Sequence, residues 1–208
     1  LDGGDGVDTL DLSKAANAIN VNLKTDKLGA STAKNFENVV GTEFDDKIKG
    51  DKEDNVLSGL GGSDTIRGRG GNDMLVGGKG DDFVFGGRGD DKLVWNNGDG
   101  SDLLNGGKGA DLVQINFDTD LVNDDLQNSD VAEFSVIDKG VGFARTELNG
   151  QTERGLFQLD IRKSETLETN FGGGDDTAVI VGSVLEAIAL DLAGGEGVDT
   201  LDLSTAKD

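Results

Sequence analysis

The chain has 208 residues, of which 34 are Gly and only 35% are hydrophobic, so it is poor in the side chains that build an ordinary compact core. Its 41 acidic and 19 basic residues give a formal net charge of −22, which argues against nucleic-acid binding and favours cations as partners. The absence of Cys and His excludes disulfides, thiolate metal sites and imidazole chemistry, and leaves hard oxygen ligands for any metal. No apolar run approaches the length of a membrane span, so none is expected.

The chain begins with a nine-residue unit. Residues 3–11, GGDGVDTLD, have Gly at positions 1, 2 and 4, Asp8 at position 6 and an apolar residue at position 8. Short alternating apolar stretches follow, for example at Val21 and Leu23. We expect residues 1–40 to start a β-solenoid with one nonapeptide and with coils that bind no ion. An unrelated antiparallel β cap is the alternative.

Residues 41–114 repeat the unit eight times. A two-residue insertion at Trp95 and Asn96, which we interpret as a bulged turn, interrupts the series. Position 6 is occupied by Asp46, Asn55, Asp64, Asp73, Asp82, Asp91, Asp102 and Asp111, and position 8 by Ile48, Leu57, Ile66, Leu75, Val84, Leu93, Leu104 and Val113. Units 41–49 and 50–58 lack Gly at positions 2 and 4, so we expect them to bind ions weakly or not at all.

These units predict an all-β fold, a parallel β-roll or β-solenoid with one loop and one short strand per unit. Alternation along each strand sends position 8 inward. Residues 115–193 leave the pattern and predict a less regular β extension. Turn signals at Lys139-Gly140 and Asn149-Gly150 indicate hairpins there. A degenerate unit over residues 171–179 places Asp176 at position 6.

The end of the chain returns to its beginning. Residues 194–204, GGEGVDTLDLS, repeat residues 3–13 with one change, an Asp replaced by Glu, and Asp199 occupies position 6. The interval is 191 residues, and we expect residues 194–208 to start the next tandem repeat. The alternative is that two consensus units simply resemble each other.

The composition of the unit suits calcium, which prefers six to eight oxygen ligands from carboxylates and carbonyls. Gly at positions 1, 2 and 4 permits the positive φ angles that turn carbonyls toward one ion. The candidate ligand residues are Asp8, Asp46, Asp64, Asp73, Asp82, Asp91, Asp102, Asp111, Asp176 and Asp199, with Gly59, Gly62, Gly68, Gly71, Gly77, Gly78, Gly80, Gly86, Gly87, Gly89, Gly98, Gly100, Gly106, Gly107 and Gly109.

Two units should make one coil, so every second unit falls on the same edge of the solenoid. One edge should stack Asp46, Asp64, Asp82 and Asp102, and the other Asn55, Asp73, Asp91 and Asp111. The gaps between them would hold up to about six ions in residues 41–114. One buried aliphatic residue per unit offsets little of the cost of ordering nine residues, so we expect folding to depend on calcium.

Residues 59–114, together with residues 3–11 and 194–202, resemble the RTX (repeats-in-toxin) family of calcium-binding β-roll proteins. The resemblance implies type I secretion from a Gram-negative-type bacterium and folding outside the cell on meeting calcium. The family includes toxins, proteases, lipases, epimerases, adhesins and surface-layer proteins, so membership alone assigns no function.

We therefore expect a calcium-dependent structural repeat of a large secreted or cell-surface protein of adhesin or surface-layer type. Neighbouring repeats or identical molecules would be partners, and cell-surface polysaccharide a further one. Lys79, Arg88, Lys92 and Lys108 are candidates for a polysaccharide contact, although scattered solubilising cations are the favoured interpretation. The alternative is a non-catalytic RTX module attached to a secreted enzyme or toxin. No catalytic activity is expected, because calcium accounts for the regularly spaced Asp residues.

Overall fold

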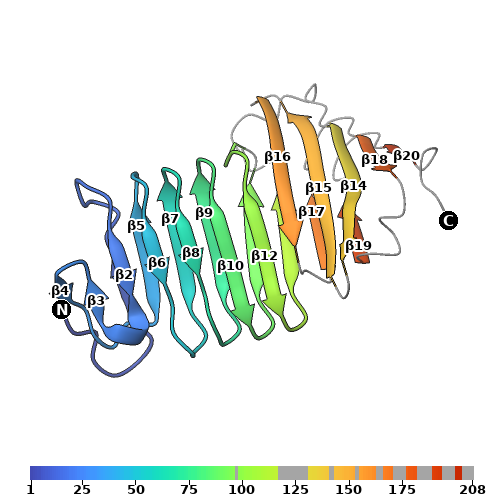
Figure 1. Cartoon of the computed structure of the whole chain (residues 1–208). Helices are drawn as coiled ribbons and strands as arrows, with labels where there is room; N and C mark the ends of the chain where they lie inside the picture. Colours follow the sequence, from blue (N-terminus) through green and yellow to red (C-terminus); the bar gives the residue numbers. More distant parts are fainter. Residues whose placement is uncertain are drawn as a thin grey trace.

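The fold is a two-sheet β-solenoid, seen here in a computed structural model in which the N-terminus and the last described strand, β20 (Thr200–Asp202), lie at opposite ends (Figure 1). The structure describes residues 1–96, 98–116, 131–140, 143–152, 155–162, 166–170, 177–181, 189–193 and 200–202. Apart from one 3-10 helix, η1 (Leu23–Thr25), the regular elements within these residues are strands. The all-β prediction is confirmed.

The smaller sheet has eight strands, and all of its neighbouring pairs are parallel. In spatial order the strands are β1 (Thr9–Asp11), β5 (Asn38–Thr42), β7 (Val56–Gly61), β9 (Met74–Lys79), β11 (Lys92–Asn96), β13 (Leu112–Asn116), β17 (Thr166–Asn170) and β19 (Ala189–Ala193). Neighbours in this sheet are separated by a whole coil of sequence, as a solenoid requires.

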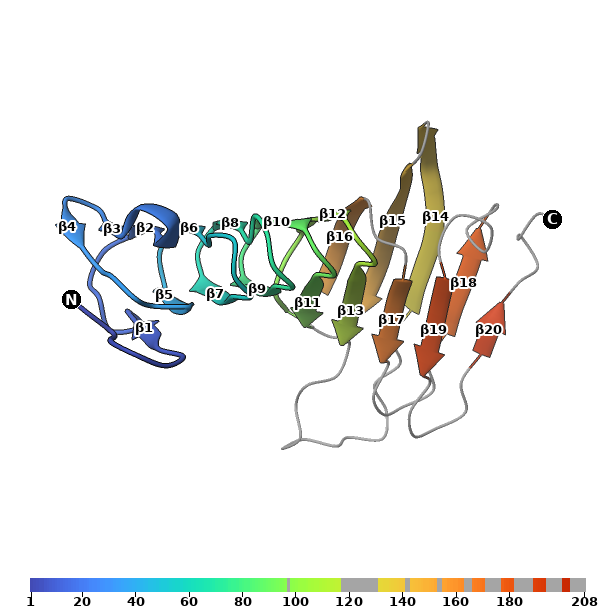
Figure 2. The same cartoon turned by 90° about the horizontal axis from the view of Figure 1, so that it is seen from below.

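The larger sheet has 12 strands and faces the smaller one across the core (Figure 2). Its order is β20 (Thr200–Asp202), β18 (Thr177–Val181), β14 (Val131–Gly140), β15 (Phe143–Thr152), β16 (Gly155–Arg162), β12 (Leu103–Lys108), β10 (Phe83–Arg88), β8 (Thr65–Arg67), β6 (Lys47–Lys49), β2 (Asn20–Asn22), β3 (Lys27–Leu28) and β4 (Ser31–Thr32). Its pairs are parallel except within β2-β3-β4 and β14-β15-β16.

The core is a ladder of the position 8 residues. All eight of them in residues 41–114 are completely buried: Ile48, Leu57, Ile66, Leu75, Val84, Leu93, Leu104 and Val113. Register partners along each sheet are the equivalent residues of successive coils, for example Leu57 opposite Leu75. The prediction that position 8 points inward is confirmed.

The insertion at Trp95 and Asn96 is not a bulged turn, and that interpretation is wrong. Both residues lie in β11, where they pair with Ile115 and Asn116 of β13. Trp95 is 1% exposed and belongs to the core. The two extra residues lengthen the strand because they bring an additional apolar side chain inward, where burial stabilises it.

The expected hairpins are present in the larger sheet. β14 pairs antiparallel with β15, and β15 with β16. The turn is not at Lys139-Gly140 itself, because these two residues end β14 opposite Ala144 and Phe143. The connection lies at residues 141–142, outside the described residues.

The turn expected at Asn149-Gly150 is wrong, because both residues lie inside β15. The pairing sets Leu148 opposite Leu159, whereas a turn at Asn149-Gly150 would have set it opposite Gln151. The connection between the two strands lies at residues 153–154, outside the described residues. Among the described residues, no helix is long and apolar enough to cross a bilayer.

Candidate metal centre

The loops that join the two sheets stack along two edges of the solenoid, and each edge carries a column of position 6 side chains. On one edge, Asp46, Asp64 and Asp82 each donate their backbone N–H to a carboxylate of the next coil. The acceptors are Oδ1 of Asp64 (2.7 Å), Asp82 (2.7 Å) and Asp102 (2.9 Å). The sequence-derived grouping of these four residues therefore matches their placement.

The second edge repeats this arrangement. Asn55, Asp73 and Asp91 donate their N–H groups to Oδ1 of Asp73 (2.8 Å), Asp91 (2.9 Å) and Asp111 (2.9 Å). The side chains of this column are 1–2% exposed. Each carboxylate is thus fixed in position by a neighbouring coil, which orients its second oxygen.

That second oxygen has no protein partner in the well-formed units. Oδ2 of Asp64, Asp73, Asp82 and Asp91 is buried and accepts no hydrogen bond. A buried carboxylate oxygen without a donor is costly unless a cation or a proton satisfies it. The structure therefore leaves one unsatisfied anionic oxygen per loop at these positions.

Gly at position 1 makes room for this carboxylate. A Cβ at Gly77 would lie 2.3 Å from Oδ2 of Asp82, and one at Gly59 only 1.9 Å from Oδ2 of Asp64. Neither glycine is among the residues with positive φ. The expectation that position 1 needs a positive φ is wrong, because what this position requires is space.

Positions 2 and 4 do have left-handed backbone. In one loop, Gly78 and Gly80 have φ angles of 99° and 128°. A Cβ at Gly80 would lie 2.0 Å from the carbonyl oxygen of Gly62, and one at Gly78 2.2 Å from that of Leu60. Carbonyl oxygens of one coil thus face the glycines of the next. Positive φ recurs at the other candidate glycines of these positions: Gly62, Gly71, Gly87, Gly89, Gly98, Gly100, Gly107 and Gly109.

Burial and mutual repulsion raise the pKa of five position 6 carboxyls. The pKa rises to about 7 for Asp64, Asp73 and Asp82, to about 6 for Asp91 and to about 9 for Asp102. In every case burial is the largest cause, and nearby carboxylates add to it. Backbone N–H donors act in the opposite direction but do not outweigh burial. Both edges therefore favour bound cations over bare charges at neutral pH.

The donor set fits calcium, a hard cation that accepts carboxylate and carbonyl oxygens in irregular geometry. Among the residues the structure describes, no group of three or more Asp or Glu converges on one point. This agrees with the stacking, since each edge offers one position 6 carboxylate per coil. Backbone carbonyls would have to supply the remaining ligands.

The first two units of the block differ from the others. Asp46 accepts the Thr42 N–H at Oδ2 (2.7 Å), and at Oδ1 it accepts the Thr42 hydroxyl (3.0 Å) and the Ile19 N–H (2.8 Å). Asn55 accepts the Asp51 N–H at Oδ1 (3.0 Å). The protein itself satisfies these oxygens, which supports the expectation that the two units bind ions weakly.

Asp8 pairs with a residue that the sequence reasoning missed. Its N–H donates to Oε2 of Glu37 (2.8 Å), its own Oδ2 is buried without a partner, and Gly4 and Gly6 have positive φ. Glu37 would have been found by writing residues 32–40 as a further unit, with Asn35 (φ 53°) at position 4. The predicted ligands Asp176 and Asp199 lie outside the described residues.

A second column of hydrogen bonds, at position 5, was also missed. Oδ1 of Asp45 accepts the Ser63 N–H (2.8 Å), and Oδ1 of Asp81 accepts the Ser101 N–H (3.0 Å). In this column the acceptor belongs to the earlier coil, whereas at position 6 it belongs to the later one. The signal in the sequence is the frequent Asp or Asn at position 5. The two columns together join each coil to both of its neighbours.

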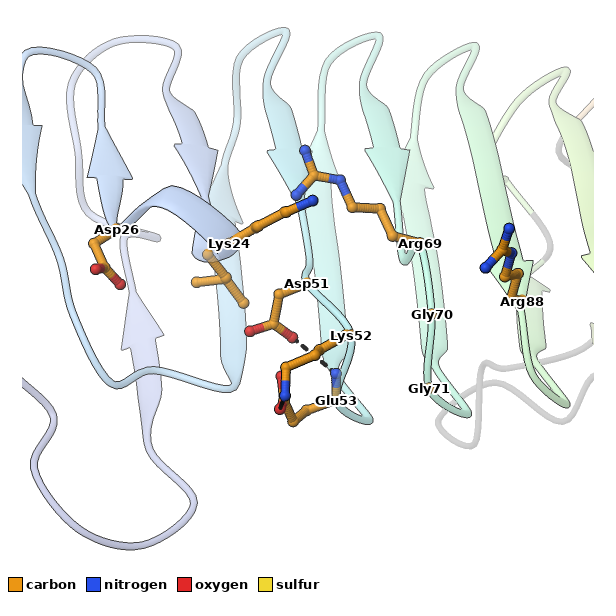
Figure 3. A pocket seen from close by; sticks show the side chains of 10 residues that line it. Lys24, Asp26, Asp51, Lys52, Glu53, Arg69, Gly70, Gly71 and Arg88 are labelled. Atoms are coloured by element: carbon orange, nitrogen blue, oxygen red, sulfur yellow. Dashed lines mark hydrogen bonds and ion pairs between the residues drawn. The ribbon is translucent and has the colours of Figure 1, made fainter.

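A cleft of about 680 Å³, lined mostly by charged residues, lies between η1 and the loops of the second edge (Figure 3). Arg69 connects the segment that carries η1 to the solenoid, because its Nη1 donates to Oδ1 of Asn22 (3.0 Å) and to the Gly50 carbonyl (2.8 Å). Of the four cations considered for polysaccharide binding, only Arg88 lines the cleft. The cleft is thus accounted for as a structural junction.

Comparison with known families identifies the repeats. The family model of the RTX calcium-binding nonapeptide repeat (4 copies) matches residues 40–75, 58–93 and 97–114. No curated protein gives a significant match to the chain. Residues 40–93 and 97–114 therefore carry RTX calcium-binding nonapeptide repeats, a kind of repeat that binds Ca²⁺. Such a β-roll is a structural calcium-binding module that is not catalytic on its own.

Proposed function

We propose that the chain is a calcium-dependent structural module of a larger secreted or cell-surface protein, and that it folds and stiffens on binding extracellular Ca²⁺. The observation that carries this proposal is the buried, unpartnered Oδ2 atom of Asp64 and Asp82 on one edge and of Asp73 and Asp91 on the other. Above pH 7, where these groups are ionised, they repel one another without cations. Calcium ions in the gaps would neutralise the carboxylates and attract those of successive coils to the same ion, which would hold the coils together.

We infer about four strong sites in residues 41–114, fewer than the upper limit of about six. They are the gaps Asp64/Asp82, Asp82/Asp102, Asp73/Asp91 and Asp91/Asp111. The gaps at Asp46 and Asn55 are weak because backbone and side-chain donors already occupy those oxygens.

The proposed role in the parent protein is that of a rod segment of adhesin or surface-layer type. Support comes from the 191-residue repeat, which a rod of tandem modules explains and an isolated folding aid does not. In this organisation residues 1–40 start the solenoid, residues 41–114 form the calcium-binding roll, residues 115–193 extend it and residues 194–208 begin another copy. The alternative role, a non-catalytic module of a secreted enzyme or toxin, requires a catalytic domain in the same gene. Sequencing the gene in both directions separates the two roles.

The folding claim is tested by circular dichroism of the purified chain in excess chelator, in millimolar calcium and in millimolar magnesium. At pH 8 we expect β structure only with calcium, because magnesium demands octahedral geometry and gives up its waters reluctantly. The same β content in chelator as in calcium would overturn the proposal.

A further inference from the structure

The C-terminal end of the solenoid exposes an apolar residue whose N-terminal counterpart is buried. Leu201 in β20 corresponds to Leu10 in β1 at the 191-residue interval. Leu10 is 4% exposed, whereas Leu201 is 53% exposed. The contrast arises because β1 pairs with β5, while β20 ends its sheet among the described strands.

The first two residues of the chain show which contacts the equivalent residues near the C-terminal end would make with a neighbouring copy. Leu1 and Asp2 lie alongside residues 32–34. The Leu1 amino group donates to the Thr32 carbonyl (3.0 Å), and the Lys34 N–H donates to the Leu1 carbonyl (3.1 Å). Asp2 also forms a parallel β-bridge with Lys34. At the same interval, Leu1 corresponds to Leu192, near the end of β19. The end of β19 is therefore expected to make these contacts with a following copy.

We propose that this end of the solenoid is a docking surface for the first coils of a following copy of the module. β20 then acts as the β1 of that copy and pairs with its β5. The end of β19 takes the place of Leu1 and Asp2 beside its β4. This inference rests on the proposed tandem organisation and adds the geometry of the junction.

The two sheets exchange places at the junction. β1 belongs to the eight-stranded sheet, but its counterpart β20 belongs to the 12-stranded one (Figure 2). Conversely, β19 lies in the eight-stranded sheet, whereas the equivalent Leu1 and Asp2 lie beside β4, a strand of the 12-stranded sheet. Both comparisons give the same result: each copy is turned by half a turn about the solenoid axis relative to the previous one.

The exchange also balances the rod. Among the strands that the structure describes, and without β20, which starts the next copy, one module contributes 11 strands to the larger sheet and eight to the smaller. If every copy had the same orientation, this inequality would accumulate and bend the rod toward the shorter sheet. Alternating half-turns give both sides equal strand counts over each pair of copies, and present a given face on opposite sides of the rod in successive modules.

The docking is tested with a two-copy chain in which residues 1–204 are followed directly by residues 14–208, so that Leu201 lies at the junction. Leu201→Ser in the first copy should lower the melting midpoint in calcium by roughly 5 °C or more. The same substitution in the single 208-residue chain should shift it by about 1 °C or less. Phe44→Ser is the matched control, because Phe44 is 44% exposed and far from either end, and it should have the same effect in both chains. Equal effects of Leu201→Ser in the two chains would overturn the docking.

The half-turn is tested with single cysteines, since the chain has none. Met74 in β9 (40% exposed) and Phe83 in β10 (51% exposed) mark the outer faces of the smaller and larger sheets. With biotin–maleimide and monovalent streptavidin, negative-stain images should show the tags on opposite sides when both copies carry Met74→Cys. They should lie on the same side when the first copy carries Met74→Cys and the second Phe83→Cys. The reverse pattern would overturn the half-turn. Failure of the single chain to fold with calcium would instead refute the proposed function.

Discussion

Asp82→Asn removes one negative charge from the middle of a carboxylate column while keeping the size of the side chain. Asp82 Oδ1 accepts the Asp64 N–H (2.7 Å), and an amide oxygen can replace it there. Oδ2 is buried without a partner and faces two proposed calcium gaps. Its replacement by an NH₂ group places a donor where a cation needs an acceptor, so both gaps lose a ligand.

The magnitude follows from linkage. A ligand at 100 times its Kd stabilises the folded state by about 2.7 kcal/mol per site. Asp82→Asn should therefore remove about 5 kcal/mol of calcium-dependent stability through its two gaps. Asp46→Asn is the matched control, because the Asp46 carboxylate already accepts hydrogen bonds from Thr42 and Ile19. It should cost about 1–3 kcal/mol, the usual cost of disturbing buried hydrogen bonds, with little dependence on calcium.

The assay is urea unfolding of both variants at several calcium concentrations, followed by circular dichroism. For Asp82→Asn, the loss of stability relative to the natural chain should grow as calcium rises. For Asp46→Asn the loss should stay constant. Equal calcium dependence in the two variants would refute the assignment of ligand and structural roles within this column.

Three other predictions address the backbone and the titration of the edges. Gly77→Ala should abolish calcium-induced folding, because the new Cβ would lie 2.3 Å from Asp82 Oδ2. Gly70→Ala is the control and should be tolerated, because its Cβ would lie 3.8 Å from the nearest atom, the Arg88 carbonyl oxygen. Circular dichroism of the two variants in calcium compares them. Leu60→Gly should stabilise the holo protein by up to about 1 kcal/mol in urea unfolding, since Leu60 has a φ of 80°, and Leu60→Ala should give no such gain. In calcium-free buffer, β structure should increase on acidification from pH 8 toward pH 4. The folded-state pKa of Asp64, Asp73 and Asp82 is about 7, against an ordinary value of 3.8. These groups therefore stabilise the fold when protonated, and this contribution is lost as the pH rises through 7. A β content that does not change between pH 8 and pH 4 would contradict this prediction.

The period of nine made the core and the two edges predictable, because position 8 and position 6 follow directly from alternation and from two units per coil. The grouping of Asp64 with Asp82, and of Asp73 with Asp91, needed no other information. The same local rule identified units 41–49 and 50–58 as atypical.

Features that depend on contacts between distant coils were not predictable in this way. One of the donors to Asp46 Oδ1 is the N–H of Ile19, 27 residues earlier. Glu37 accepts the Asp8 N–H although the unit over residues 32–40 lacks the glycines. Trp95 lies in a strand because it pairs with Ile115 of the next coil. The prediction of a turn at Asn149-Gly150 is wrong for a similar reason, because pairing with β16 outweighs the local preference of these two residues for a turn.

The central claim is that calcium orders the repeat block, and the fluorescence of Trp95 tests it most directly. Trp95 is the only tryptophan, is 1% exposed, and donates from Nε1 to the Gly100 carbonyl (3.1 Å) beside the strongest predicted sites. A calcium titration from chelator to ten millimolar should shift its emission to the blue in one cooperative transition, because the indole moves from water into the core. An emission spectrum that is already blue-shifted in chelator, or that does not change across the titration, would contradict the account.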